Sequence, residues 1–143
     1  MKEQIQESKL KKITIPSTVT SIDQNAFYAC RSLTHVTIPS TVISIGDSAF
    51  AYCSSLQYIE IPSSVTTIGN SAFAGCSKLP DITIPSTVTS IGASAFSTCT
   101  SLNTIVISSF ATSIGDGAFR NCRKLQSVIR DELKRHYGDG IFT

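Results

Sequence analysis

Residues 56–78 read LQYIEIPSSVTTIGNSAFAGCSK, and a segment of this form occurs five times in succession without insertion or deletion. The leucines that open the segments lie 23 residues apart, and an Ala-Phe pair and a cysteine follow each leucine in phase. The shared pattern is L-x-x-I-x-I-P-S-x-V-x-x-I-G-x-x-A-F-x-x-C-x-x. A fixed period in this range indicates a solenoid, in which each repeat forms one coil that stacks on the next.

The order of residues within one coil predicts its path. Ile13 and Ile15 are two apart, which places both on one face of a short strand, and each coil is expected to add one such strand to a parallel sheet. Pro16 then ends the strand, because proline has no N–H to continue a ladder. A second extended stretch follows and runs to a glycine at positions 46, 69, 92 and 115, where we expect a turn with positive φ; the first coil has Asp23 instead, a residue that tolerates this region.

The eight apolar positions of each coil are predicted to face inward, so that like residues form columns through the stack. The five cysteines then lie about 4.8 Å apart with parallel Cβ vectors, farther than the ~3.5–4.5 Å that a disulfide needs between Cβ atoms. No paired C-x-x-C spacing of the kind found in zinc sites is present. We therefore expect free, buried thiols, no metal, and a matching column of phenylalanines in the core.

The IPSxVxxIGxxAFxxC signature resembles the BspA-like class of leucine-rich repeats over residues 10–129. The chain departs from the pattern at Asp23, Pro80, Ser108 and Ala111, and Pro80 is expected to bend the sheet slightly. The resemblance implies a leucine-rich-repeat solenoid of the α/β horseshoe class, here rich in β structure, with extended and turn segments opposite the sheet. It also implies a surface or secreted protein of adhesion type that binds a protein ligand, such as a host or matrix protein. The N-terminal residues show no signal peptide, and no apolar run reaches the length needed for membrane insertion.

The chain divides into three parts. Residues 1–9 look like a lead-in and cap, residues 10–124 form five repeats, and residues 125–143 form a partial sixth repeat with a C-terminal cap. In this last part Leu125, Val128 and Ile129 are expected to begin a sixth strand. Residues 131–137 then read as a short helix that Gly138 ends.

Charge and composition argue against several functions. Residues 1–12 carry a net +2, residues 13–119 a net −3 and residues 120–143 a net +3. The body of the chain has only Arg31 and Lys78 as cations, so a nucleic-acid partner is not expected. With two histidines, no nucleophile elbow and no glycine-rich phosphate loop, the sequence indicates neither an enzyme nor a cofactor.

The positions that vary and point outward from the sheet are the candidate binding site. Two residues after each leucine, and again four residues after it, the side chains share the solvent face of the sheet. These columns predict a mixed patch centred on His35, Tyr58, Glu60 and Asp81, with Lys12 in the same column. Two other interpretations stay open: a solvated surface whose residues drift without function, and a structural spacer or self-associating segment without a specific ligand.

The last coil has apolar residues on a nominally wet face. Val106 and Phe110 replace polar residues, and Ile129 is in the same column as Val106. We expect either that Ile141 and Phe142 fold back over this end contact or that a partner covers it. An incomplete cap would also allow a homodimer through the ends of the solenoid.

Overall fold

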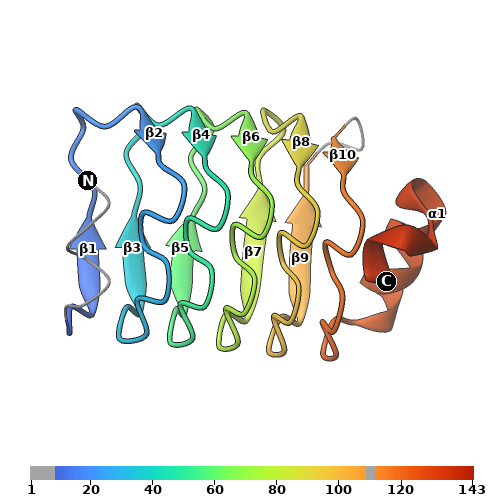
Figure 1. The fold of residues 1–143 in the computed structure, drawn as a ribbon. Helices are drawn as coiled ribbons and strands as arrows, with labels where there is room; N and C mark the ends of the chain where they lie inside the picture. The colour runs from blue at the N-terminus through green and yellow to red at the C-terminus, as the bar shows by residue number, and fades with distance from the viewer. Residues whose placement is uncertain (1–8, 109–111) are drawn as a thin grey trace.

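The computed structural model describes residues 9–108 and 112–143, and its coils stack side by side into a solenoid (Figure 1). One parallel ladder follows the leucines, as the repeat pattern predicts. Its strands are β1 (Lys12–Thr14), β3 (His35–Thr37), β5 (Tyr58–Glu60), β7 (Asp81–Ile84) and β9 (Thr104–Ile107). The register is shifted by one repeat at each step, so that Lys12 pairs with His35 and His35 with Tyr58.

The second extended stretch is also a strand, so each coil contributes two strands where the sequence predicted one. The strands of this continuous parallel ladder are β2 (Ser21–Ile22), β4 (Ser44–Ile45), β6 (Thr67–Ile68), β8 (Ser90–Ile91) and β10 (Ser113–Ile114). A third set of hydrogen bonds joins the coils near the phenylalanines; for example, the N–H of Phe27 donates to the carbonyl of Ala49 at 2.7 Å. Backbone groups therefore tie neighbouring coils together along three sides.

The predicted internal columns are present. The five phenylalanines at positions 27, 50, 73, 96 and 119 are fully buried, and their rings stack with centroids 5.1–5.5 Å apart and nearly parallel planes. The five cysteines are buried and free. Each thiol from Cys53 onward donates a hydrogen bond to a phenylalanine carbonyl in the preceding coil, as Cys76 does to Phe50 at 3.2 Å. This bond, which the repeat pattern alone does not reveal, satisfies a buried carbonyl at each level of the stack.

The prediction of positive φ at the repeat glycines is wrong. Positive φ occurs elsewhere, at two positions in each coil, such as Ser71 and Gly75 in the third. The repeat glycines are instead required by close approach of backbones: a Cβ at Gly69 would lie 2.6 Å from the amide nitrogen of Asp47 in the preceding coil. Asp23 is accommodated in the first coil because no described coil lies before it.

Pro80 does more than bend the sheet. At this position of the other coils the amide donates to the preceding coil, as Gln57 does to the carbonyl of Thr34 at 2.9 Å. Proline has no such donor. The first ladder is accordingly split into a three-stranded sheet, β1-β3-β5, and a two-stranded sheet, β7-β9.

The predicted sixth strand is wrong, because the chain forms helix α1 (Ser127–Tyr137) from the point where that strand would start. The column that holds Ile107 inside the fifth coil would place Arg130 inside a sixth, and a buried unpaired charge is costly. A helix avoids this, since Ile129, Leu133 and Tyr137 are spaced to form one apolar stripe. Leu133 is buried, and Arg130 instead donates to the carbonyl of Cys122 at 2.7 Å. The helix ends at Gly138, as predicted.

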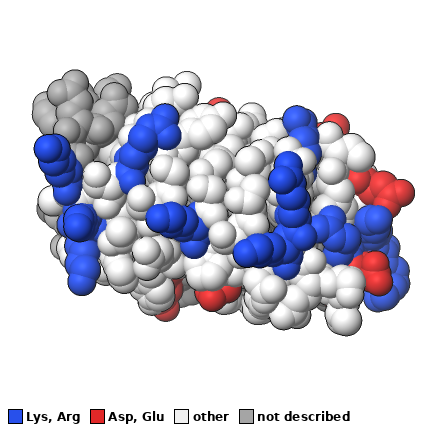
Figure 2. Space-filling view, turned by 90° about the horizontal axis from the view of Figure 1, so that it is seen from below, with Lys and Arg blue, Asp and Glu red and all other residues white. Residues whose placement is uncertain are grey.

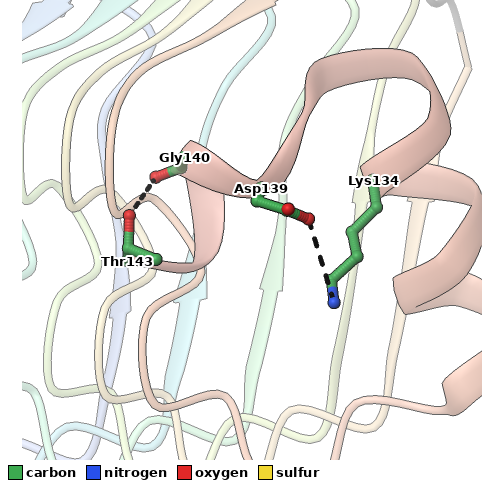
Figure 3. Close-up of polar contacts among 4 residues, drawn as sticks. All are labelled: Lys134, Asp139, Gly140 and Thr143. Carbon is green, nitrogen blue, oxygen red and sulfur yellow. Dashed lines mark hydrogen bonds and ion pairs between the residues drawn. The ribbon is translucent and has the colours of Figure 1, made fainter.

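The last residues complete the core rather than cover Val106, which corrects the expected fold-back. They form the short 3-10 helix η2 (Asp139–Phe142), which carries a hydrogen bond from the Thr143 hydroxyl to the Gly140 carbonyl and is joined to α1 by the ion pair of Lys134 with Asp139 (Figure 3). Phe142 stands 23 residues after Phe119, and the two rings lie 6.1 Å apart. Ile141 is buried, and its carbonyl accepts the amide of Phe119 at 2.7 Å. The C-terminal end of the stack is therefore capped.

Candidate functional site

The candidate site lies on the solvent face of the first ladder. Strand residues alternate there between buried and exposed, so that in β5 Ile59 is buried while Tyr58 and Glu60 are exposed. The inward isoleucines fix the strand, and the alternation then leaves the side chains between them free to vary. Tyr58 has half of its surface (51%) exposed, which is unusual for a large aromatic residue with no partner to cover it.

Three of the predicted residues contact one another directly. The rings of His35 and Tyr58 are 6.0 Å apart in neighbouring strands. The Tyr58 hydroxyl donates to Glu60 Oε1 at 3.4 Å, and His35 Nδ1 lies 2.9 Å from Thr34 Oγ1. The histidine and the carboxylate are thus held on either side of one exposed aromatic ring.

A hollow separates this cluster from Asp81. It has a volume of about 290 Å³ and lies between β5 and β7, where Pro80 splits the ladder. The lining residues are Tyr58, Ile59, Glu60, Ile61, Asp81, Ile82 and Thr83. Two exposed carboxylates, those of Glu60 and Asp81, therefore stand on opposite walls with the tyrosine ring beside them.

Backbone groups also face the hollow. In the intact part of the ladder, the outward residues bond back to the preceding coil, as the amide of His35 does to the carbonyl of Lys11 at 3.1 Å. No ladder pairing joins β5 and β7, so the corresponding groups of Asp81 and Thr83 lack these partners. The sequence analysis placed the right side chains here but missed the hollow, for which Pro80 was the available signal.

Lys12 is the predicted residue that the structure leaves at the margin. It pairs with His35 in register and is exposed, but β3 separates its strand from Tyr58. The structure thus brings together His35, Tyr58, Glu60 and Asp81 and places Lys12 beside the histidine only.

The predicted end contact forms a second hollow, of about 270 Å³, between β9 and α1. Val106 and Ile129 line it together with Leu133, and Val106 is 48% exposed. Phe110, the third residue of this prediction, lies outside the described residues. This hollow remains open because α1 does not pair with β9.

Residues suited to metal or cofactor chemistry do not converge in the part of the chain that the structure describes. No group of three or more His, Cys, Asp and Glu side chains there could hold a metal ion. Helix α1, the one α-helix among the described residues, is too short and too polar to cross a membrane.

Comparison with known proteins identifies the repeat. The family model described as BspA type leucine rich repeat region matches residues 2–134 in six copies. No protein of curated function matches the sequence.

Solved structures give the same result. A leucine-rich repeat protein from Bacteroides ovatus is 39% identical with a TM-score of 0.76, over 81% of this chain and 30% of that one. A leucine rich cell surface protein from Faecalibacterium prausnitzii is 38% identical with a TM-score of 0.72, over 82% of this chain and 38% of that one. The pneumococcal vaccine antigen PcpA shares the fold, at 24% identity and a TM-score of 0.61 over 78% of this chain and 38% of that one. The chain therefore spans only about a third of the length of these neighbours.

Proposed function

Since the chain belongs to the BspA type family of leucine-rich repeat proteins, we propose that it is a non-catalytic binding module of a cell-surface protein and that it binds a protein through the hollow between β5 and β7. The description of the Faecalibacterium neighbour as a cell surface protein supports the location. The observation that carries the proposed activity is the hollow itself, with an exposed tyrosine and two carboxylates on its walls.

The partner that fits this site is an extended protein segment with a basic side chain. A Lys or Arg between Glu60 and Asp81 would meet two carboxylates that the described residues leave without an ion pair. The Tyr58 ring offers a large, rigid contact surface of the kind that dominates interface energies. Backbone groups of Asp81 and Thr83, which lack ladder partners, can pair with an extended main chain.

The repeat itself supplies variants that remove the site without disturbing the fold. Threonine occupies the position of Tyr58 and Asp81 in the fourth coil, as Thr104, and the position of Glu60 in several coils. We therefore suggest the triple variant Tyr58→Thr, Glu60→Thr, Asp81→Thr. The matched control is Ile43→Thr, which removes an exposed apolar side chain far from the hollow, next to β4.

A phage library of short random peptides selected on the wild-type protein tests the proposal. The selected peptides should be enriched in Lys or Arg, and the triple variant should weaken their binding by about 2 kcal/mol or more, roughly 30-fold in Kd. The Ile43→Thr control should bind as wild type. Selection of no peptides, or of peptides that bind the triple variant equally well, would leave a spacer as the better interpretation.

A further inference from the structure

The edge of the solenoid at which the first-ladder strands begin carries a strong positive charge. We call this surface the basic edge and define it by residues 9–11, 30–34, 53–57, 76–80, 99–103 and 122–126, the turns that lead into each strand and into α1. It holds six of the chain's 12 Lys and Arg residues and none of its 10 Asp and Glu residues. The six cations are Lys9, Lys11, Arg31, Lys78, Arg123 and Lys124. Figure 2 looks onto this edge and shows blue side chains along its whole length, with red ones gathered at the margins and at the C-terminal end.

These charges are available to a ligand. All six side chains belong to exposed residues. Within residues 9–108 and 112–143 the ion pair found is that of Lys134 with Asp139, which lies outside the basic edge. Because nearby acids do not neutralise the edge, its positive potential extends into solvent and attracts anions.

The cations recur at a regular interval that follows from the stack. Lys78 and Lys124 occupy the same coil position two coils apart, and Arg31 and Arg123 share a position four coils apart. The first, third and fifth coils thus carry cations while the second and fourth do not. Coils advance by about 4.8 Å, so the interval is roughly 10 Å along a straight edge. The phosphates of a duplex strand follow at ~3.4 Å, so this spacing is better suited to a linear polymer with sparser charges.

Two exposed tyrosines lie at the same edge. Tyr28 and Tyr52 are 37% and 46% exposed, their ring centroids are 5.7 Å apart, and their planes are nearly perpendicular. Tyr52 lies against Gly75, where a Cβ would approach its ring to 2.5 Å, so the glycine in the next coil makes room for the ring. The pair stands beside Arg31, one residue after Cys30, and offers an aromatic surface next to a cation.

We propose that the basic edge binds a linear acidic polysaccharide. Arg31, Lys78 and Lys124 contact successive sulfate or carboxylate groups of the polymer, and the Tyr28–Tyr52 pair packs against the apolar face of a sugar ring. This surface differs from the acidic hollow between β5 and β7, so the inference does not depend on the proposed protein binding.

The test uses a heparin oligosaccharide and a triple variant drawn from the repeat. Arg31→Ser, Lys78→Ser and Lys124→Ser each introduce the serine that other coils have at the same position, for example Ser54 and Ser55 in the second coil. We expect about tenfold weaker binding at low salt and a shallower dependence of log Kd on log salt concentration, because fewer counterions are released. The control Lys12→Thr, Lys134→Ser, Arg135→Ser removes the same number of charges elsewhere and should bind as wild type.

A second variant examines the aromatic part of the site. Tyr52→Asn introduces the residue found at the same position in the fifth coil, Asn121, which also has positive φ. It should weaken heparin binding several-fold without changing the salt dependence. Comparison with hyaluronan, which has carboxylates but no sulfates, identifies the preferred anion.

Three results would overturn the proposal. The triple variant could bind heparin as tightly as wild type, which removes the basic edge from the interaction. The control could lose affinity to the same extent, which would mean that net charge alone is responsible. A single-stranded oligonucleotide could bind more tightly than heparin at equal salt, which would assign the edge to nucleic acid instead.

Discussion

The substitution Gly69→Ala probes the close approach of coils most sharply. The added Cβ would lie 2.6 Å from the backbone nitrogen of Asp47, about 0.8 Å inside the 3.4 Å at which ordinary contact begins. It would also lie 2.5 Å from Asp47 Oδ1, the atom that accepts the Asn70 amide at 2.8 Å. Overpacking of this kind costs ~1–3 kcal/mol. We expect a loss near ~3 kcal/mol, at the upper end, because ladders on both sides hold the two backbones in place.

Urea unfolding measures this loss, and thermal unfolding should show a decrease in Tm of roughly 6–12 °C for a chain of this size. Gly140→Ala is the matched control, because the same methyl group would meet only Asp116 Oδ1 at 3.4 Å. Its free energy of unfolding should not fall by more than ~0.5 kcal/mol. If Gly69→Ala were as stable as Gly140→Ala, the contact between coil backbones described here would be wrong.

Three further predictions concern the strained positions, the thiols and the cap. Thr98→Gly should stabilise the protein by about 1 kcal/mol in urea unfolding, because Thr98 has a φ of 59° that glycine adopts without steric cost; a loss of stability would contradict this. Burial raises the pKa of Cys76 to about 12, so the unfolded chain releases this proton first and stability should fall by ~1.4 kcal/mol per pH unit above about pH 8.5, a dependence that Cys76→Ser should lessen by the same amount and that equal slopes would disprove. Deletion of residues 138–143 removes Ile141 and Phe142 from the end of the core and should lower the free energy of unfolding by ~2–5 kcal/mol, whereas an unchanged Tm would show that these residues do not cap the stack.

The sequence predicts the solenoid well because the same constraint repeats in every coil. A Phe at position 73 could occupy several environments by itself, but five phenylalanines in phase can all be buried only if the coils stack directly. The cysteine column follows from the same argument, and the free thiols agree with the expected distance between Cβ atoms.

Features that depend on the contact between neighbouring coils were harder to predict. The pattern showed a glycine at position 69 but not whether positive φ or close approach required it, because both demand the absence of a Cβ. At the C-terminus, Val128 and Ile129 continued the strand pattern, whereas the charge at Arg130 in an inward column decided for a helix. That conflict was visible in the sequence once the column of each residue was followed.

The candidate site was predicted in part for the same reason. Alternation along a strand places Tyr58, Glu60 and Asp81 on one face without knowledge of the neighbouring coils. The hollow between them depends on the missing amide of Pro80, whose effect on the next strand is a property of the stacked coils and not of either strand alone. The basic edge likewise emerges only when turns 23 residues apart are placed side by side.

Native-state labelling of the cysteines with a bulky thiol reagent tests the stacked arrangement most directly. Mass spectrometry after brief exposure at about pH 8 should find Cys53, Cys76 and Cys99 unmodified, since each is fully buried and donates to a carbonyl of the preceding coil. All three should react at once when urea unfolds the chain. Rapid modification of Cys76 in the folded protein would contradict the internal column and the surfaces assigned from it.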